Sequence, residues 1–113
     1  MSWWGDAAGA PTLGHSEKEL VAECKKIAAA MNAYLEVAGQ LKARGSGSTV
    51  GLPDGFLYCS GKCLPIEFKT EKGRLSAAQA GAQHRRMEQG VHTWIIRKPE
   101  EFIDLVNLCR RTA

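Results

Sequence analysis

The residues best suited to chemistry lie between Gly51 and Gln79, in the stretch GLPDGFLYCSGKCLPIEFKTEKGRLSAAQ. Asp54 follows a proline, and Glu67 and Lys69, separated by Phe68, stand near the end of an apolar run. Two carboxylates and an exposed main-chain carbonyl form the oxygen-rich kind of site that Mg²⁺ accepts together with water and a substrate phosphate. Lys69 would then stand where it can orient or activate an attacking water. These residue types point to metal-dependent hydrolysis of a phosphate ester.

A β-hairpin is the element that must position these groups. The apolar runs 56–59 and 63–68 are separated by a Ser-Gly-Lys turn, the pattern of two strands joined by a tight connection. Paired strands lie about 4.8 Å apart, so Asp54 at the entry to one strand can approach Glu67 on the other. Side chains alternate along a strand, which puts Glu67 and Lys69 on one face and Ile66 and Phe68 on the other. Each feature alone is common in ordinary turns and strand edges, so the hypothesis depends on the whole string.

Taken in order, Gly-x-Pro-Asp, the hairpin, Ile-Glu-Phe-Lys-Thr and Lys-Gly-Arg-Leu-Ser-x-x-Gln resemble the PD-(D/E)xK nuclease superfamily, and more closely its VRR-NUC branch of virus-type replication and repair nucleases. The resemblance covers residues 17–108. It implies an α/β, restriction-endonuclease-like sandwich in which a small mixed β-sheet is flanked by helices. It also implies a DNA endonuclease that depends on Mg²⁺ or Mn²⁺, with Asp54, Glu67, Lys69 and Gln79 as its catalytic residues.

The first helix is predicted to begin at Ser16, which forms a capping box with Glu19, and to end at Gly39. The resemblance implies an additional metal ligand on this helix, and Glu23, at the rim of the apolar face, matches it best. Glu19 is the competitor, but its capping role already accounts for it, and Glu17 is a weaker choice. The implied metal ligands are Glu23, Asp54, Glu67 and the Phe68 carbonyl.

Basic residues begin where the proposed active site ends. Residues 1–71 carry seven Lys and Arg against eight Asp and Glu, whereas residues 72–113 carry eight against four. This bias fits a polyanionic partner, although without the motif a solvated surface of mixed charge would be the default interpretation. The residues we assign to DNA contacts are Lys72, Arg74, Ser76, Arg85 and Arg86.

A second helix is predicted from Ser76 to Gly90, where Ser76 and Gln79 form another capping box. The resemblance places this glutamine beside the active site, where it would hold substrate or the attacking water. Both roles are compatible if the helix N-terminus points at the metal, and its dipole would also favour phosphate. His84 is predicted to be a surface residue or a phosphate contact rather than a catalytic base.

The remaining segments are predicted to support this site. Residues 1–15, which include Trp3 and Trp4, form a flexible arm, and residues 16–113 form the single nuclease domain. Residues 40–44 would form a short strand and 45–48 a flexible loop. Residues 91–97 would form a central strand parallel to an earlier one, followed by a last helix that begins at Pro99.

The four cysteines lack the spacing of a zinc site, and we expect reduced core thiols in a cytoplasmic protein. Cys59 and Cys63 flank the hairpin turn and could meet across it.

Composition sets the outer limits. A chain of 113 residues with 44% hydrophobic and 24% charged residues is expected to form one soluble globular domain. No apolar run approaches the length of about 20 residues that a membrane span needs. The N-terminus lacks the basic start and apolar core of a secretory signal, so a cytoplasmic location is the default.

The resemblance further implies a phage-encoded homodimer that cuts branched DNA such as Holliday junctions in the cytoplasm of a bacterial host. Two other classes stay open: a catalytically silent DNA-binding or assembly subunit with the same fold, and a metal-dependent phosphoesterase acting on small nucleotides. Intact Asp54, Glu67 and Lys69 argue against the first, and the basic turn at Lys72 and Arg74 favours an open groove over the pocket that the second would need.

Overall fold

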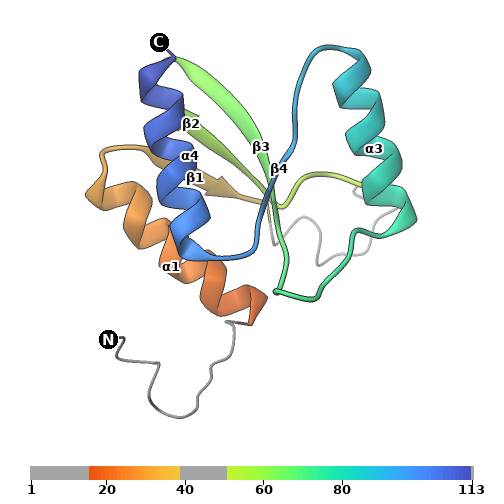
Figure 1. The fold of residues 1–113 in the computed structure, drawn as a ribbon, viewed down its shortest axis with the longest axis horizontal. Coiled ribbons are helices and arrows are strands. Elements are labelled where there is room, and N and C mark those ends of the chain that lie inside the picture. Colours follow the sequence, from red (N-terminus) through yellow and green to blue (C-terminus); the bar gives the residue numbers. More distant parts are fainter. Residues whose placement is uncertain (1–15, 39–50, 113) are drawn as a thin grey trace.

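The fold is a small mixed sheet between helices, described by a computed structural model for residues 16–38 and 51–112 (Figure 1). Its elements are α1 (Glu17–Ala30), β1 (Tyr34–Val37), β2 (Gly55–Cys59), β3 (Lys62–Phe68), α3 (Ala77–Glu88), β4 (Trp94–Ile96) and α4 (Pro99–Arg111). The sheet order is β1-β2-β3-β4, antiparallel except that β4 runs parallel to β3. Helices α1 and α4 pack together on one side of the sheet and α3 lies on the other (Figure 1). The predicted α/β sandwich is confirmed.

Helix α1 begins as predicted and ends earlier. Ser16 and Glu19 form the capping box, and Leu20 and Cys24 belong to its buried stripe. The helix stops at Ala30, so the prediction that it continues to Gly39 is wrong. Asn32 adopts a positive φ of 59°, a left-handed conformation that asparagine tolerates better than most residues and that ends the helix.

The segment after Asn32 forms β1 instead of helix. Its four residues alternate between exposed and more buried positions, and the strand pairs antiparallel with β2. Glu36, predicted to be helical, lies on this strand and accepts a hydrogen bond from the Tyr58 hydroxyl at 2.8 Å. Residues 39–50, with the predicted strand at 40–44 and the loop at 45–48, lie outside the described residues, as does the arm 1–15 with its two tryptophans.

The β2–β3 hairpin is confirmed, with a two-residue turn at Ser60 and Gly61. Both residues have positive φ, 53° and 78°, as the tight connections that match the twist of paired strands require. This turn fixes the register, in which Cys59 pairs with Lys62 and Gly55 with Ile66.

The same register separates the two cysteines of the hairpin. Cys63 pairs with Tyr58, not with Cys59, so the two thiols point to opposite faces of the sheet. Cys59 is buried, whereas Cys63 is exposed. The predicted contact between them is therefore wrong, and so is the prediction that Cys63 belongs to the core. All four cysteines are free thiols.

Helix α3 begins at Ala77 after its cap at Ser76, and the chain turns at Gly90, whose φ is 86°. The following strand β4 is shorter than predicted and, in the described part of the chain, lies at the edge of the sheet rather than in its centre. The strand is apolar on both faces although it is not central. Ile96 packs into the core beneath α1 and α4, and Ile95, which is paired with Glu67, lies on the face toward α3.

The core lies between the sheet and the pair α1 and α4. Its buried members are Leu20, Cys24, Ala28, Leu35, Leu57, Cys59, Ile66, Phe68, Ile96, Phe102, Leu105, Val106 and Cys109. Burial, and secondarily the neighbouring Glu23 carboxylate, raise the pKa of the Cys24 thiol to about 12. In the ranges 16–38 and 51–112, no helix combines the length and apolar composition that crossing a membrane requires.

Candidate active site

The two central carboxylates stand at the same end of the hairpin. Gly55 pairs with Ile66, so the residue before it, Asp54, comes opposite Glu67. Asp54 Oδ2 accepts a hydrogen bond from the Phe68 main-chain N–H at 2.8 Å, which ties the aspartate to the strand that carries the glutamate. Its own carbonyl accepts from the Ala38 N–H at 2.9 Å, extending the link to β1. The Pro-Asp segment is thus fixed between its two neighbouring strands.

Glu67 is a fully buried carboxylate. Its side chain is 0% exposed, although the flanking Ile66 and Phe68 point into the hydrophobic core on the other face. Glu67 therefore projects toward α3, where polar groups meet it. A buried carboxylate is costly unless hydrogen bonds and opposite charge compensate it, so these neighbours define the site.

Gln79 is the first of these neighbours and uses both ends of its amide. Its side-chain Oε1 accepts from the main-chain N–H of Ser76 at 3.0 Å, and its main-chain N–H donates to Ser76 Oγ at 3.1 Å, which completes the capping box. Its Nε2 donates to Glu67 Oε1 at 3.2 Å. The cap thus fixes which end of the amide faces the carboxylate, and Gln79 combines its capping role with a contact to the candidate site.

Arg86 is the second neighbour, two turns further along α3. Its Nη2 lies 4.0 Å from Glu67 Oε2, its Nε donates to Thr93 Oγ1 at 2.8 Å, and its Nη1 lies 3.5 Å from the Gly51 carbonyl. Thr93 is itself only 1% exposed. The structure thus directs the partly buried Arg86 side chain toward Glu67, and its predicted contact with a DNA backbone stays a prediction.

The loop that joins β3 to α3 is shaped by Arg97, at the end of β4. A single nitrogen, Nη1, donates to the carbonyls of Thr70 at 2.8 Å, Glu71 at 3.4 Å and Gly73 at 2.6 Å. A side chain at Gly73 would crowd Thr70, because a Cβ there would lie 2.9 Å from Thr70 Oγ1 and 3.3 Å from Thr70 N. The loop is therefore folded around the guanidinium.

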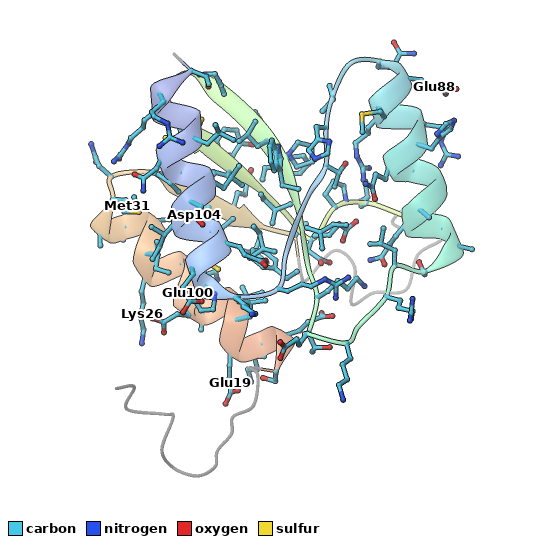
Figure 2. The ribbon with its side chains drawn as sticks, viewed as in Figure 1. Glu19, Lys26, Met31, Glu88, Glu100 and Asp104 are labelled. Atoms are coloured by element: carbon cyan, nitrogen blue, oxygen red, sulfur yellow. The ribbon has the colours of Figure 1, made fainter. Side chains whose placement is uncertain are left out.

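Lys69 lies at the start of this loop, directly after β3. Its main-chain N–H donates to the Ile96 carbonyl at 3.1 Å, continuing the parallel ladder, and its side chain is half-buried. Beyond it, the predicted DNA-contacting residues Lys72, Arg74, Ser76 and Arg85 are exposed. His84 is exposed as well and lies 3.4 Å from the Glu88 carboxylate, one turn further along α3 near its end (Figure 2).

The donors present suit a divalent cation held by few protein ligands. Mg²⁺ is usually bound by one or two carboxylates together with substrate phosphates and water, and Asp54 and Glu67 offer that number. Among residues 16–38 and 51–112, however, no group of three or more His, Cys, Asp or Glu side chains is placed to hold a metal ion. Glu23 is half-buried on α1, which packs against the opposite face of the sheet from Glu67, and it forms no such group with the other two carboxylates.

Sequence reasoning missed the roles of Arg86, Thr93 and Arg97. A signal for the first was present, since Gln79, Ala82 and Arg86 are spaced three and four residues apart and so share one face of α3. No local pattern indicates that Thr93 is buried or that Arg97 bonds to a loop more than 20 residues earlier in the chain. These contacts arise only when β4 lies beside β3.

The mixed four-stranded sheet with helices on both faces is an α/β sandwich of the restriction-endonuclease-like class. Among solved structures, the fold matches a chain described as a VRR_NUC domain, with a TM-score of 0.62 and 14% sequence identity, over 82% of this chain and 97% of the other. The chain therefore has the VRR-NUC nuclease fold. No protein-family model matches the sequence, and no curated protein matches it.

Proposed function

We propose that the protein is a DNA endonuclease that depends on Mg²⁺ or Mn²⁺ and hydrolyses phosphodiester bonds. The observation that carries this proposal is the placement of Asp54 opposite Glu67 at the end of the hairpin, with Lys69 two residues beyond and the Gln79 amide on the glutamate. The VRR-NUC fold supports it, because this arrangement of carboxylates then lies in a nuclease framework.

Asp54, Glu67 and the Phe68 carbonyl would hold the cation, and a bound cation would polarise the phosphate and lower the pKa of water. Lys69 would orient the attacking water and stabilise negative charge that develops on the phosphate. Gln79 would hold Glu67 in a single orientation, since its amide is itself fixed by the helix cap.

DNA would approach along the exposed basic surface beside this site. Lys72 and Arg74 project from the loop that Arg97 shapes, and Arg85 is exposed on α3. Contacts of this kind bind the sugar-phosphate backbone without reading sequence, so they suit an enzyme selective for DNA structure. We further propose a branched substrate such as a four-way junction and a homodimer that supplies two active sites for paired nicks, both on the strength of the resemblance.

The second candidate is a catalytically silent DNA-binding subunit. Protein donors already engage both carboxylates: the Phe68 N–H binds Asp54, and the Gln79 amide binds Glu67. Such contacts would stabilise the acidic pair without a metal, and this observation favours the silent subunit.

The test is cleavage of a labelled four-way junction beside a duplex of the same sequence, with Mg²⁺, Mn²⁺ or EDTA. We expect metal-dependent cutting that Asp54→Asn, Glu67→Gln and Lys69→Ala each abolish. Asp104→Asn is the matched control, because this exposed carboxylate lies on α4, in the helix layer away from α3 (Figure 2). Metal-independent binding without cutting would support the silent subunit, and cutting that persists in Glu67→Gln would refute the proposed site.

A further inference from the structure

The partly buried guanidinium of Arg86 faces the central carboxylate of the site. Arg86 comes from α3 and is itself only 21% exposed, while Glu67 comes from β3 and is 0% exposed. A surface arginine would lose little by turning into solvent, but this one is held in place by three different segments of the chain. Its position therefore calls for a specific explanation.

The three contacts fix the guanidinium from different sides. Thr93, just before β4, accepts from Nε at 2.8 Å, the Gly51 carbonyl lies 3.5 Å from Nη1, and Nη2 lies 4.0 Å from Glu67 Oε2. Gly51 is pressed against α3, since a Cβ there would come within 3.0 Å of the Ala78 carbonyl. Arg86 thus links Gly51, which precedes the Pro-Asp segment, with Glu67 on β3 and Thr93 just before β4.

We propose that Arg86 is an internal counter-ion of Glu67 that weakens, and so sets, the affinity of the site for its divalent cation. This inference rests on the proposed function. A fixed positive charge beside the carboxylate stabilises the metal-free site and repels an incoming cation, because like charges interact strongly where water is scarce. Arg86 is a positioning residue: it acts on the metal through Glu67.

The amide of Gln79 meets Oε1 of the Glu67 carboxylate, and Arg86 meets Oε2. One oxygen is thus oriented by a neutral donor and the other by a cation. Replacing Arg86 by an apolar side chain should leave the Gln79 contact at Oε1 in place and remove the positive charge that competes with the metal ion at Oε2.

The experiment measures Mn²⁺ binding and melting temperature without DNA, at one pH and ionic strength. We expect Arg86→Met to bind Mn²⁺ at least about tenfold more tightly than the native chain, which corresponds to about 1.4 kcal/mol. Without metal the variant should melt below the native protein, and saturating Mn²⁺ should close most of that gap. Arg86→Lys keeps the charge and should stay near the native affinity.

Arg85→Met is the matched control, because it removes the same charge from the next residue of α3, which is exposed. Its Mn²⁺ affinity should equal that of the native chain. Equal affinities of Arg86→Met and the native protein would overturn the inference, and so would equal shifts in Arg86→Met and Arg86→Lys.

Glu67→Gln separates this inference from the proposed function. If native Mn²⁺ binding is lost in Glu67→Gln but unchanged in Arg86→Met, the metal site stands and only the counter-ion role fails. If the native chain binds no Mn²⁺, both proposals fail together.

Discussion

Replacing Gln79 by alanine removes two hydrogen bonds that have different consequences. One is the capping bond from the Ser76 N–H to the amide oxygen, and the other is the bond from the amide nitrogen to Glu67. The chain contains a natural control for the first. In α1, Glu19 accepts from the Ser16 N–H at the same distance of 3.0 Å, and it lies at the start of α1, away from α3 (Figure 2).

Comparing the capping boxes of α1 and α3 separates the free energy of the capping bond from that of the bond to Glu67. A typical hydrogen bond contributes about 0.5–1.5 kcal/mol to stability, and one to a charged group about 1.5–3 kcal/mol. Gln79→Ala should therefore lower the free energy of unfolding by about 2–4.5 kcal/mol. Glu19→Ala should lower it by only about 0.5–1.5 kcal/mol, because the Glu19 carboxylate is exposed and water screens its charge. Glu19→Ala also loses an interaction of about 0.3–1 kcal/mol between the carboxylate and the helix dipole, which reduces the expected difference in unfolding free energy between the two variants.

Urea unfolding followed by circular dichroism gives both free energies at equal ionic strength without metal. Gln79→Glu is the third variant: it keeps an oxygen for the cap but sets a second carboxylate against Glu67, so we expect it to be at least as destabilised as Gln79→Ala. If Gln79→Ala and Glu19→Ala cost the same, then Gln79 is only a cap and the reasoning about Glu67 is refuted.

Three further predictions concern the frame around the site. Gly55→Ala should destabilise the fold by about 1–3 kcal/mol in urea unfolding, because its Cβ would lie 2.6 Å from the Glu36 carbonyl. Gly81→Ala is the control and should be neutral or stabilising, because the nearest atom to its Cβ is a side-chain atom at 3.7 Å. Equal effects of the two substitutions would contradict the close approach of the Glu36 carbonyl to Gly55. A thiol reagent should label one cysteine rapidly in the native protein, and Cys63→Ser should abolish that phase; rapid labelling of a second thiol would contradict the burial of the others. The pKa of Cys24 is about 12 in the fold against an ordinary 9.0, so the stability that its protonated thiol contributes is complete below pH 9 and is lost as the pH rises towards 12. Cys24→Ala should therefore flatten the fall of the free energy of unfolding between pH 9 and 12. An unchanged slope would refute the raised pKa of Cys24.

Features encoded by neighbouring residues were the ones that the sequence predicted well. Both capping boxes need only a serine and an acid or amide three residues later, so Ser16 and Ser76 marked their helices correctly. The hairpin turn was equally local. The placement of Asp54 opposite Glu67 then followed from strand pairing.

The wrong helix end and the missed contact of Arg86 with Glu67 both depend on tertiary contacts. Leu35 continues the helical spacing of α1 by coincidence, and a four-residue strand is too short to reveal its alternation, so only pairing with β2 settles the structure there. Arg85 and Arg86 are adjacent and chemically identical, yet one is exposed and the other is directed into the site. Which of them turns inward depends on where α3 sits over Glu67.

The way Arg97 holds the β3–α3 loop bears on how such a protein can change over time. The guanidinium binds main-chain carbonyls of residues 70, 71 and 73, and no side chain of those positions takes part. Substitutions at Lys72 and Arg74 can therefore alter the charge presented beside the candidate active site while the path of the backbone is preserved. A relative that keeps Arg97 and Gly73 can change the charge of its loop surface by point substitutions, with little loss of stability at each step.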